Sequence, residues 1–208
     1  MQHRDKPRRA ISFIDGQNLF RHAKSAFGYH HPNFDPLKLA KAVCRDLGLD
    51  QHMVRFYTGF PRKDIDPFWH GYWSNRFRAM SRSSIHVIKR RLSYQTQRIN
   101  LAGGQTTEST VVREKGIDVR ISLDVFKMLV NGEYDAAIIF SQDQDLAEAV
   151  ADVREYSERL SLGIRVYSAF PSSSTASSTW KIRGTIPFPM DRAFYDACID
   201  HSDYRPFG

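Results

Sequence analysis

The chain has 208 residues, of which 41% are hydrophobic and 12% aromatic, enough to build the core of one domain of ordinary size. This composition excludes wholesale disorder, and the longest apolar run, residues 136–140, is too short for a membrane-spanning helix. The two cysteines, Cys44 and Cys198, provide neither a disulfide framework nor a thiolate zinc site. Asp15 interrupts what would be the apolar core of a signal peptide, so we expect a cytoplasmic globular protein without a membrane partner.

Charge is distributed unevenly along the chain, whose formal net charge is +7. Residues 1–113 contain 20 Lys and Arg against 8 Asp and Glu, whereas residues 114–158 contain 4 against 11. A basic body around an acidic segment suits an enzyme that attracts a polyanion and holds metal ions where it cuts. Charge alone leaves open the alternative of a solvated surface with uneven charge.

Apolar runs and helical patterns alternate along the chain. In chain order the pattern predicts a strand at 11–14, helices at 18–27 and 35–46, a strand at 54–60, an aromatic helix at 67–80, a strand at 85–88, a helix at 116–131, a strand at 136–140, a helix at 143–160 and a strand at 164–169. Strands that are apolar on both faces and separated by helices indicate a mainly parallel sheet covered on both sides. We therefore predict an α/β fold, a three-layer α/β/α sandwich.

Two stretches interrupt this alternation. Residues 91–113 are rich in Gln, Thr, Ser and Gly and predict a long, mobile loop beside the active site. The Ser and Thr cluster at 172–179 predicts the end of the core. The expected organisation is a basic N-terminal arm (1–9), one domain (10–170) and a C-terminal appendage (171–208).

Acidic side chains follow directly after two of the predicted strands. Asp15 ends the first strand, and Asp143 and Asp145 follow the strand at 136–140. Because ligands bind beyond the carboxyl ends of parallel strands, these carboxylates would meet at one edge of the sheet if the two strands are neighbours. Capping of the next helix is the alternative role for each, and the strongest alternative for Asp143.

The helix predicted after the loop is apolar over most of its circumference. At about 100° per residue, Asp118 falls inside the apolar arc, whereas Asp124 falls toward an exposed stripe and is a weaker candidate. A second apolar arc, with Val119, Leu123 and Val130, is expected to be buried as well. An unpaired buried carboxylate costs several kcal/mol, so Asp118 requires a compensating cation.

Two kinds of cation could compensate Asp118. Lys115 or Arg113 would form an ion pair, whereas a metal ion would bind Asp118 together with other carboxylates. We favour the metal ion, because Asp15 and Asp143 are expected nearby and would complete an oxygen-only site. Hard oxygen ligands in incomplete number suit Mg²⁺ or Mn²⁺, which activate water and stabilise the leaving oxygen of a phosphodiester.

Three motifs resemble those of the NYN domain, a branch of the PIN-like nucleases that includes the LabA-like group. They are FIDGQN at 13–18, EKGIDVRISLD at 114–124 and FSQDQDL at 140–146, and they occur in the family's order. The resemblance covers about residues 10–170. It implies a PIN-like (NYN) fold and the activity of a metal-dependent ribonuclease.

The resemblance also implies roles for single residues. Asp15, Asp118 and Asp143 would hold the metal ion, and Asp145 would be a further ligand or a base. Asn18 would orient a water or a phosphate oxygen. These five residues are the catalytic residues that the resemblance implies.

The third motif departs from the family's usual Ser-Gly-Asp-x-Asp-Phe. Leu146 replaces the aromatic residue and still fills an apolar position. Gln142 replaces the glycine and could narrow the approach to the metal. By the same resemblance, Ser141 would shape the loop.

Aromatic and basic residues mix between positions 60 and 78, a composition that often binds single-stranded nucleic acid through stacking and phosphate contacts. Trp69, Trp73 and Phe77 lie at helical spacing, which is more typical of a core stripe. A second basic run follows the strand predicted at 85–88. The candidate nucleic-acid contacts, with solvated charge as the alternative for each basic one, are Arg62, Lys63, Tyr72, Arg76, Lys89, Arg90 and Arg91.

The leading hypothesis is a metal-dependent endoribonuclease with Mg²⁺ or Mn²⁺ as cofactor and RNA, preferably single-stranded, as substrate. A protein of the same fold that binds RNA or a partner without cleavage is the alternative, favoured by Gln142. A metal-dependent phosphatase acting on a small phosphate ester is a third option. The sequence does not separate RNA from DNA, and the oligomeric state stays open, with a homodimer as one option.

Overall fold

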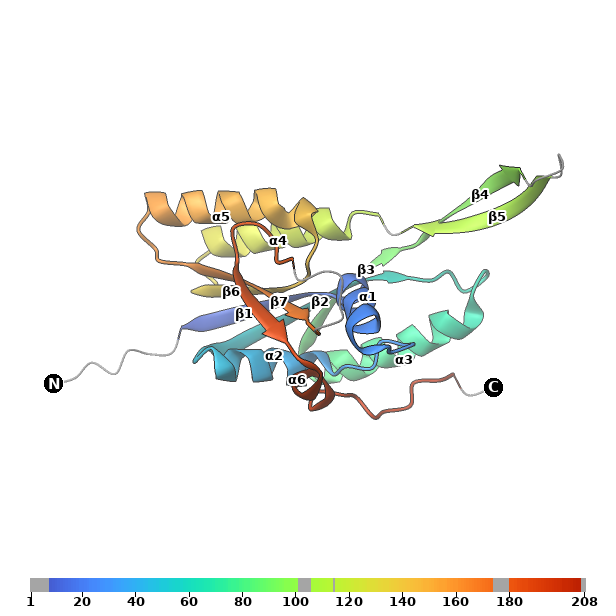
Figure 1. The fold of residues 1–208 in the computed structure, drawn as a ribbon, viewed down its shortest axis with the longest axis horizontal. Coiled ribbons are helices and arrows are strands. Elements are labelled where there is room, and N and C mark those ends of the chain that lie inside the picture. The colour runs from blue at the N-terminus through green and yellow to red at the C-terminus, as the bar shows by residue number, and fades with distance from the viewer. Residues whose placement is uncertain (1–7, 101–105, 114, 174–179, 207–208) are drawn as a thin grey trace.

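A six-stranded sheet, parallel throughout, forms the centre of the protein (Figure 1). The computed structural model describes residues 8–100, 106–113, 115–173 and 180–206. The strand order is β3-β2-β1-β6-β7-β8, so the first strand of the chain lies in the middle. The strands are β1 (Arg9–Asp15), β2 (Asp50–Phe60), β3 (Ile85–Arg91), β6 (Ala136–Phe140), β7 (Arg165–Pro171) and β8 (Ile186–Met190).

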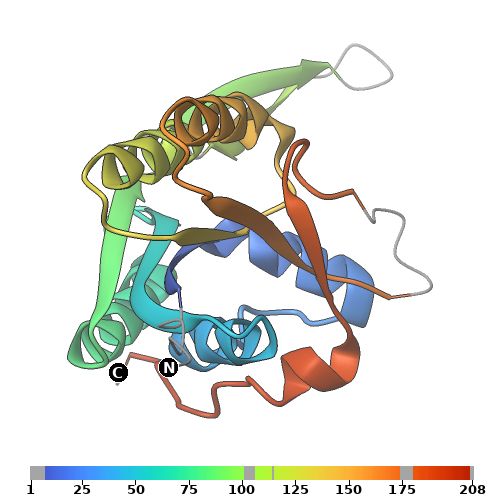
Figure 2. The same ribbon diagram turned by 90° about the vertical axis from the view of Figure 1, so that its left-hand side faces the viewer.

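Helices cover both faces of the sheet, which confirms the predicted three-layer sandwich (Figure 2). One face carries α4 (Ile117–Val130) and α5 (Ala147–Arg159), the latter preceded by the short 3₁₀ helix η1 (Gln144–Leu146). The other face carries α1 (Gly16–Phe27), α2 (Pro36–Asp46), α3 (Pro67–Arg82) and α6 (Arg192–Asp196). No helix in the described ranges is long and apolar enough to cross a membrane.

The strand β1 shows how the sequence produces these layers. Its side chains alternate between the faces, so Ile11 and Phe13 join the core under α4 and α5, whereas Ala10 and Ile14 join the core on the other side. All four are fully buried. A strand that is buried on both faces, as β1 is, is therefore stable only between two layers of helices.

The predicted loop at 91–113 is instead an antiparallel hairpin. Arg91 completes β3, and β4 (Ser93–Asn100) pairs with β5 (Thr106–Arg113) in a ribbon that extends away from the body (Figure 1). At its base, the backbone N–H of Arg62 donates a hydrogen bond to the Tyr94 hydroxyl at 3.3 Å. The loop prediction was wrong because the ribbon packs on no large core and so lacks the apolar alternation that identifies a strand.

The C-terminal residues belong to the same sheet, so the expectation of an appendage outside the core was also wrong. β8 pairs with β7, and Ile182, Met190 and Tyr195 are fully buried. Two prolines in β8 hide it from a strand pattern, and its position at the sheet edge tolerates them. Of the predicted N-terminal arm, residues 1–7 lie outside the described residues, and Arg9 begins β1.

Candidate active site

A cavity of about 340 Å³ opens at the carboxyl ends of β1 and β6, which are neighbours in the sheet. It is lined by residues from both strand ends, from α1, from the start of α4 and from the base of the hairpin, namely Asp15, Gln17, Asn18, Arg21, Leu92, Val112, Gly116, Ile117, Asp118 and Asp143. The structure thus brings together the three predicted metal ligands and Asn18. We call this the acidic cavity.

Asp15 is the last residue of β1 and is only 7% exposed. Its carboxylate accepts a hydrogen bond from the Asn18 backbone N–H at 2.9 Å and so caps α1. A Cβ at Gly16 would lie 2.5 Å from the Phe56 ring, so glycine is needed for α1 to start this close to the sheet. Burial raises the pKa of Asp15 to about 6; the hydrogen bond from Asn18 opposes this rise and the Asp143 charge adds to it.

Asp143 lies on the neighbouring loop and is half-buried. Its backbone N–H donates to the Ser141 hydroxyl at 3.1 Å, and its carboxylate accepts from the Asp145 backbone N–H at 3.1 Å, capping η1. Ser141 is buried and its carbonyl accepts a hydrogen bond from the Ser168 hydroxyl at 2.8 Å. Ser141 thus holds the loop that presents Asp143, and capping by Asp143 coexists with its place in the cavity.

Asn18 joins the ends of β1 and β6. Its Oδ1 accepts a hydrogen bond from the Gln142 backbone N–H at 3.0 Å, which leaves the Nδ2 donor as the polar group to offer the cavity. The Gln142 side chain is 6% exposed, donates to the Trp180 carbonyl at 2.7 Å and does not line the cavity. The substitution of glycine by Gln142 therefore does not narrow the approach to the carboxylates.

The N-terminus of α4 opens onto the same cavity. Gly116 precedes the helix with φ +76°, a conformation that favours glycine, and it has no side chain to cap the first N–H groups. Asp118 lies in the first turn and is half-buried. Of its two predicted ion-pair partners, Lys115 is exposed and does not line the cavity, and the side chain of Arg113 lies outside the described ones.

Arg21 and Gln17 were missed by sequence reasoning. Both line the cavity from α1, and the Arg21 guanidinium donates to Gln17 Oε1 at 3.2 Å. Their spacing gives the signal that could have found them, because positions 17, 18 and 21 share one side of the helix that Asp15 caps. The next residue, His22, is half-buried, and its pKa is lowered by burial and then by the Arg21 charge.

Asp145 is separated from the other predicted ligands. It is exposed and lines a second groove, between α4 and α5, that it shares with Asp118 but not with Asp15 or Asp143. The predicted set of carboxylates is therefore divided between two neighbouring depressions, with Asp118 at the border.

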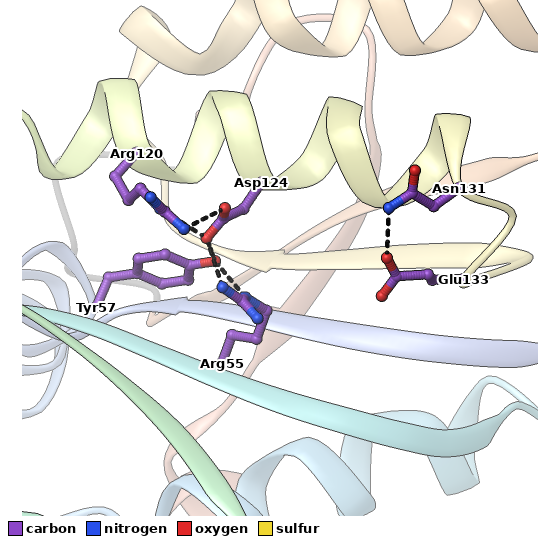
Figure 3. Close-up of polar contacts among 6 residues, drawn as sticks. All are labelled: Arg55, Tyr57, Arg120, Asp124, Asn131 and Glu133. Carbon is purple, nitrogen blue, oxygen red and sulfur yellow. Dashed lines mark hydrogen bonds and ion pairs between the residues drawn. The ribbon is translucent and has the colours of Figure 1, made fainter.

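Asp124 is a structural residue, and the prediction that it lies toward an exposed stripe was wrong. It is 5% exposed and forms ion pairs with Arg55 at 2.7 Å and Arg120 at 2.9 Å (Figure 3). The Tyr57 hydroxyl donates a third hydrogen bond at 2.8 Å. Burial alone would raise the pKa of Asp124, but these three donors outweigh burial and hold the pKa below its ordinary value.

The predicted nucleic-acid contacts lie in several places. Arg76 is 1% exposed and donates to the carbonyls of Pro32 and Phe34, both at 2.6 Å, so it stabilises the core and the prediction of an RNA contact was wrong. Tyr72 is half-buried in a separate cleft between α3 and the C-terminal residues. The Lys89 ammonium lies 5.1 Å from the centre of the Phe60 ring.

Three of the basic candidates line a cavity of about 610 Å³ next to the acidic one. This basic cavity contains Arg62, Lys63 and Arg91, and it shares Leu92 with the acidic cavity. The Arg62 charge is paired with Asp64. Arg90 is exposed on the same strand as Arg91.

The donor set of the acidic cavity fits a hard divalent cation. Within the described ranges, no three Asp, Glu, His or Cys side chains lie close enough to form a ready metal cage. Mg²⁺, however, is usually bound through one or two carboxylates and retains several waters. The negative charge of Asp143 raises the pKa of Asp15, and a bound cation would offset this repulsion. Asp118 lines the same cavity, so these oxygens suit Mg²⁺ or Mn²⁺.

Comparisons with known proteins agree with this architecture. Residues 9–179 match the family model of the NYN domain. A solved structure similar to this chain is that of VPA0982 from Vibrio parahaemolyticus, a protein of unknown function, with a TM-score of 0.55 and 18% identity over 92% of this chain and 98% of that chain. At that identity the likeness concerns the fold alone. No protein with a curated description matches the chain.

Proposed function

Since the chain belongs to the NYN domain family, a family of PIN-like nucleases, we propose that it is a metal-dependent endoribonuclease that acts at the acidic cavity. One observation carries the proposal. Asp15 is a buried carboxylate whose pKa is raised to about 6, and the charge that acts on it most strongly is that of another carboxylate, Asp143. Such a pair is unfavourable by itself and becomes favourable when a cation binds between the two charges.

The proposed metal ligands are Asp15 and Asp143, with Asp118 as a third oxygen donor. When bound, Mg²⁺ or Mn²⁺ supplies Lewis-acid chemistry, lowering the pKa of water and neutralising charge that develops on a phosphodiester. Asp15 and Asp143 are held in place by the caps that they form on α1 and η1. The ligands thus keep their positions while the substrate binds.

Three groups in the acidic cavity can bind a phosphate. Arg21 contributes a guanidinium, Asn18 contributes its Nδ2 amide donor, and the uncapped first turn of α4 contributes backbone N–H groups. Helix N-termini favour anions through these free donors and through the helix dipole. These donors line the same cavity as the carboxylates that would hold the metal.

A single strand of RNA is the proposed substrate, and the basic cavity is its proposed path from the acidic cavity. Leu92 lines both cavities, so a strand that leaves one enters the other. Lys63 and Arg91 provide cations there, whereas the Arg62 charge is already neutralised by Asp64. Phosphate contacts of this kind bind RNA without reading its sequence.

The test is cleavage of labelled single-stranded and structured RNAs with Mg²⁺, with Mn²⁺ or with chelator. We expect cleavage by the parent protein with either ion, and none by Asp15→Asn or Asp143→Asn. Asp50→Asn, at an exposed carboxylate where β2 begins, is the matched control and keeps full activity. Activity that survives in both site variants contradicts the proposal, and RNA binding without cleavage by the parent supports a binding protein instead.

The RNA path is tested with binding assays at fixed salt concentration. Arg91→Ala should weaken RNA binding by a similar factor for every RNA sequence, because it removes a phosphate contact. Arg82→Ala, an exposed arginine at the end of α3, is the control and should leave binding unchanged. Equal losses in the two variants would assign RNA binding to overall charge rather than to the basic cavity.

A further inference from the structure

The helix α4 has an apolar face that is open to solvent. Val119, Leu123 and Val130 are 58%, 62% and 48% exposed, although the sequence predicts them to be buried. The opposite face of the helix, with Ile121 and Val125, is fully used by the core. A row of exposed large apolar side chains on an otherwise well-packed helix is typical of an interaction surface.

A groove of about 450 Å³ between α4 and α5 continues this face. Its apolar lining comes from Val119, Leu123 and Phe126 of α4 and Ala149 of α5, and α4 borders it over about two turns and α5 over about one. The charges around it are one-sided: four carboxylates, from Asp118, Asp145, Glu148 and Asp152, and a single ammonium from Lys127. We call it the α4–α5 groove.

We propose that the α4–α5 groove docks a basic amphipathic helix of a partner protein. A groove lined by apolar side chains and four carboxylates is complementary to a helix that has an apolar stripe flanked by Arg or Lys. A second copy of this chain packed on the same face would place the same carboxylates against each other, which disfavours a symmetric pair. Charge complementarity therefore selects a basic partner.

The α4–α5 groove and the acidic cavity share one lining residue, Asp118. A cation of the docked helix that pairs with Asp118 removes a ligand from the metal and adds positive charge beside it. Docking is therefore expected to inhibit cleavage, a consequence that rests on the proposed nuclease function, whereas docking itself does not.

The probe is a fluorescent peptide of about 18 residues with a Leu stripe flanked by Arg, long enough to form a helix on the surface. Its binding to the full chain is followed by anisotropy, beside a scrambled peptide of the same composition. We expect binding that Leu123→Ser and Glu148→Lys each weaken about tenfold. Leu160→Ser, at the residue that follows α5, and Glu155→Lys, on α5, are exposed positions outside the groove; they are the matched controls and should change little.

Three results overturn the docking proposal. The first is binding of the scrambled peptide with the same affinity. The second is a loss of affinity in the control variants as large as that in the groove variants. The third is a dimer in sedimentation that Leu123→Ser dissociates, which would assign the groove to a second copy. Peptide binding that leaves RNA cleavage unchanged refutes the link through Asp118. If the parent cleaves no RNA, the proposed function fails while the anisotropy still decides on docking.

Discussion

Asp15 and Asp124 are buried to almost the same extent, 7% and 5% exposed, in opposite electrostatic surroundings. Asp124 faces two guanidinium groups and a phenol, which hold its pKa below the ordinary value despite burial. Asp15 faces a backbone N–H and the carboxylate of Asp143, and its pKa rises to about 6. Burial alone therefore does not distinguish a structural carboxylate from a functional one.

The difference lies in what compensates the charge. The protein supplies the cations for Asp124 itself, and that carboxylate ties β2 to α4. For Asp15 the protein supplies a helix cap, the negative charge of Asp143 and the guanidinium of Arg21, whose charge lowers the pKa by less than Asp143 raises it. A buried carboxylate whose charge is not fully compensated lowers the stability of the metal-free protein. This loss of stability is usual for a site that has to bind a cation.

The largest difference between Asp15 and Asp124 is expected in the rate of RNA cleavage. Asp15→Asn should reduce RNA cleavage about a thousandfold or more, because a catalytic metal supplies several kcal/mol of transition-state stabilisation. Folded Asp124→Asn should cleave at close to the parent rate, since its carboxylate lies outside the acidic cavity. Single-turnover rates at saturating Mg²⁺ measure both, and an equal loss in the two variants would remove the distinction.

The second test concerns stability. Asp124→Ala should lower the free energy of unfolding by about 3 kcal/mol, because it leaves the Arg55 guanidinium, 15% exposed, without its anion. Urea denaturation at pH 7 measures the change. Glu158→Ala is a suitable control, since its ion pair with Arg154 is exposed and is worth little. A loss below about 1 kcal/mol for Asp124→Ala would mean that the cluster in Figure 3 adds little to stability.

Replacing Asp15, in contrast to Asp124, should raise the free energy of unfolding. Asp15→Asn should stabilise the metal-free protein at pH 7 by up to about 3 kcal/mol, the free-energy equivalent of raising a pKa from 3.8 to about 6. The amide still caps α1, so the helix does not lose its cap. Thermal unfolding with chelator tests this expectation, and a destabilised variant would contradict it.

The stability that Asp15→Asn gains over the parent should depend on pH, in the direction set by the raised pKa of Asp15. Because folding raises the pKa of Asp15, the parent keeps the proton more tightly when folded, and the associated stability is complete below about pH 4 and lost as the pH rises through about 6. The difference between Asp15→Asn and the parent should therefore grow between pH 4 and 6 and level off above. A difference that is constant over this window would show that Asp15 is not the titrating group.

The smallest effect is expected at Asp118. This carboxylate is half-buried in the first turn of α4, so Asp118→Asn should change the free energy of unfolding by less than about 0.5 kcal/mol. Urea denaturation decides the point, and a loss as large as that of Asp124→Ala would place Asp118 among the structural carboxylates.

Much of the fold could be predicted from the sequence because the sheet is buried on both faces. Strands such as Ala136–Phe140 are apolar at every position, and the polar residues that end them mark the carboxyl edge of the sheet. The same logic places Asp15 and Asp143 beside each other, since their strands are neighbours in the order observed. Periodicity and strand-end polarity are local signals, and local signals are visible in one sequence.

The errors concern side chains whose position depends on distant partners. Asp124 was assigned to an exposed stripe because Val119 and Leu123 are apolar, whereas Arg55 on β2 attracts Asp124 inward and turns the two apolar residues outward. The mixture of basic and aromatic residues around Arg76 predicts an RNA contact, yet its two terminal nitrogens donate to backbone carbonyls inside the core. The pattern along α4 shows Arg120 but not Arg55, and the pattern along α3 does not show the two carbonyls, because these partners come from other parts of the chain.

The central position of β1 has a consequence for synthesis. One side of β1 pairs with β2, which follows soon along the chain, but the other side waits for β6, which begins about 120 residues later. At translation rates of roughly 5–20 residues per second, an emerging chain spends roughly 6–24 s with this strand as an unprotected edge. Slower translation between residues 16 and 135 should therefore lower the soluble yield of an unchanged amino-acid sequence.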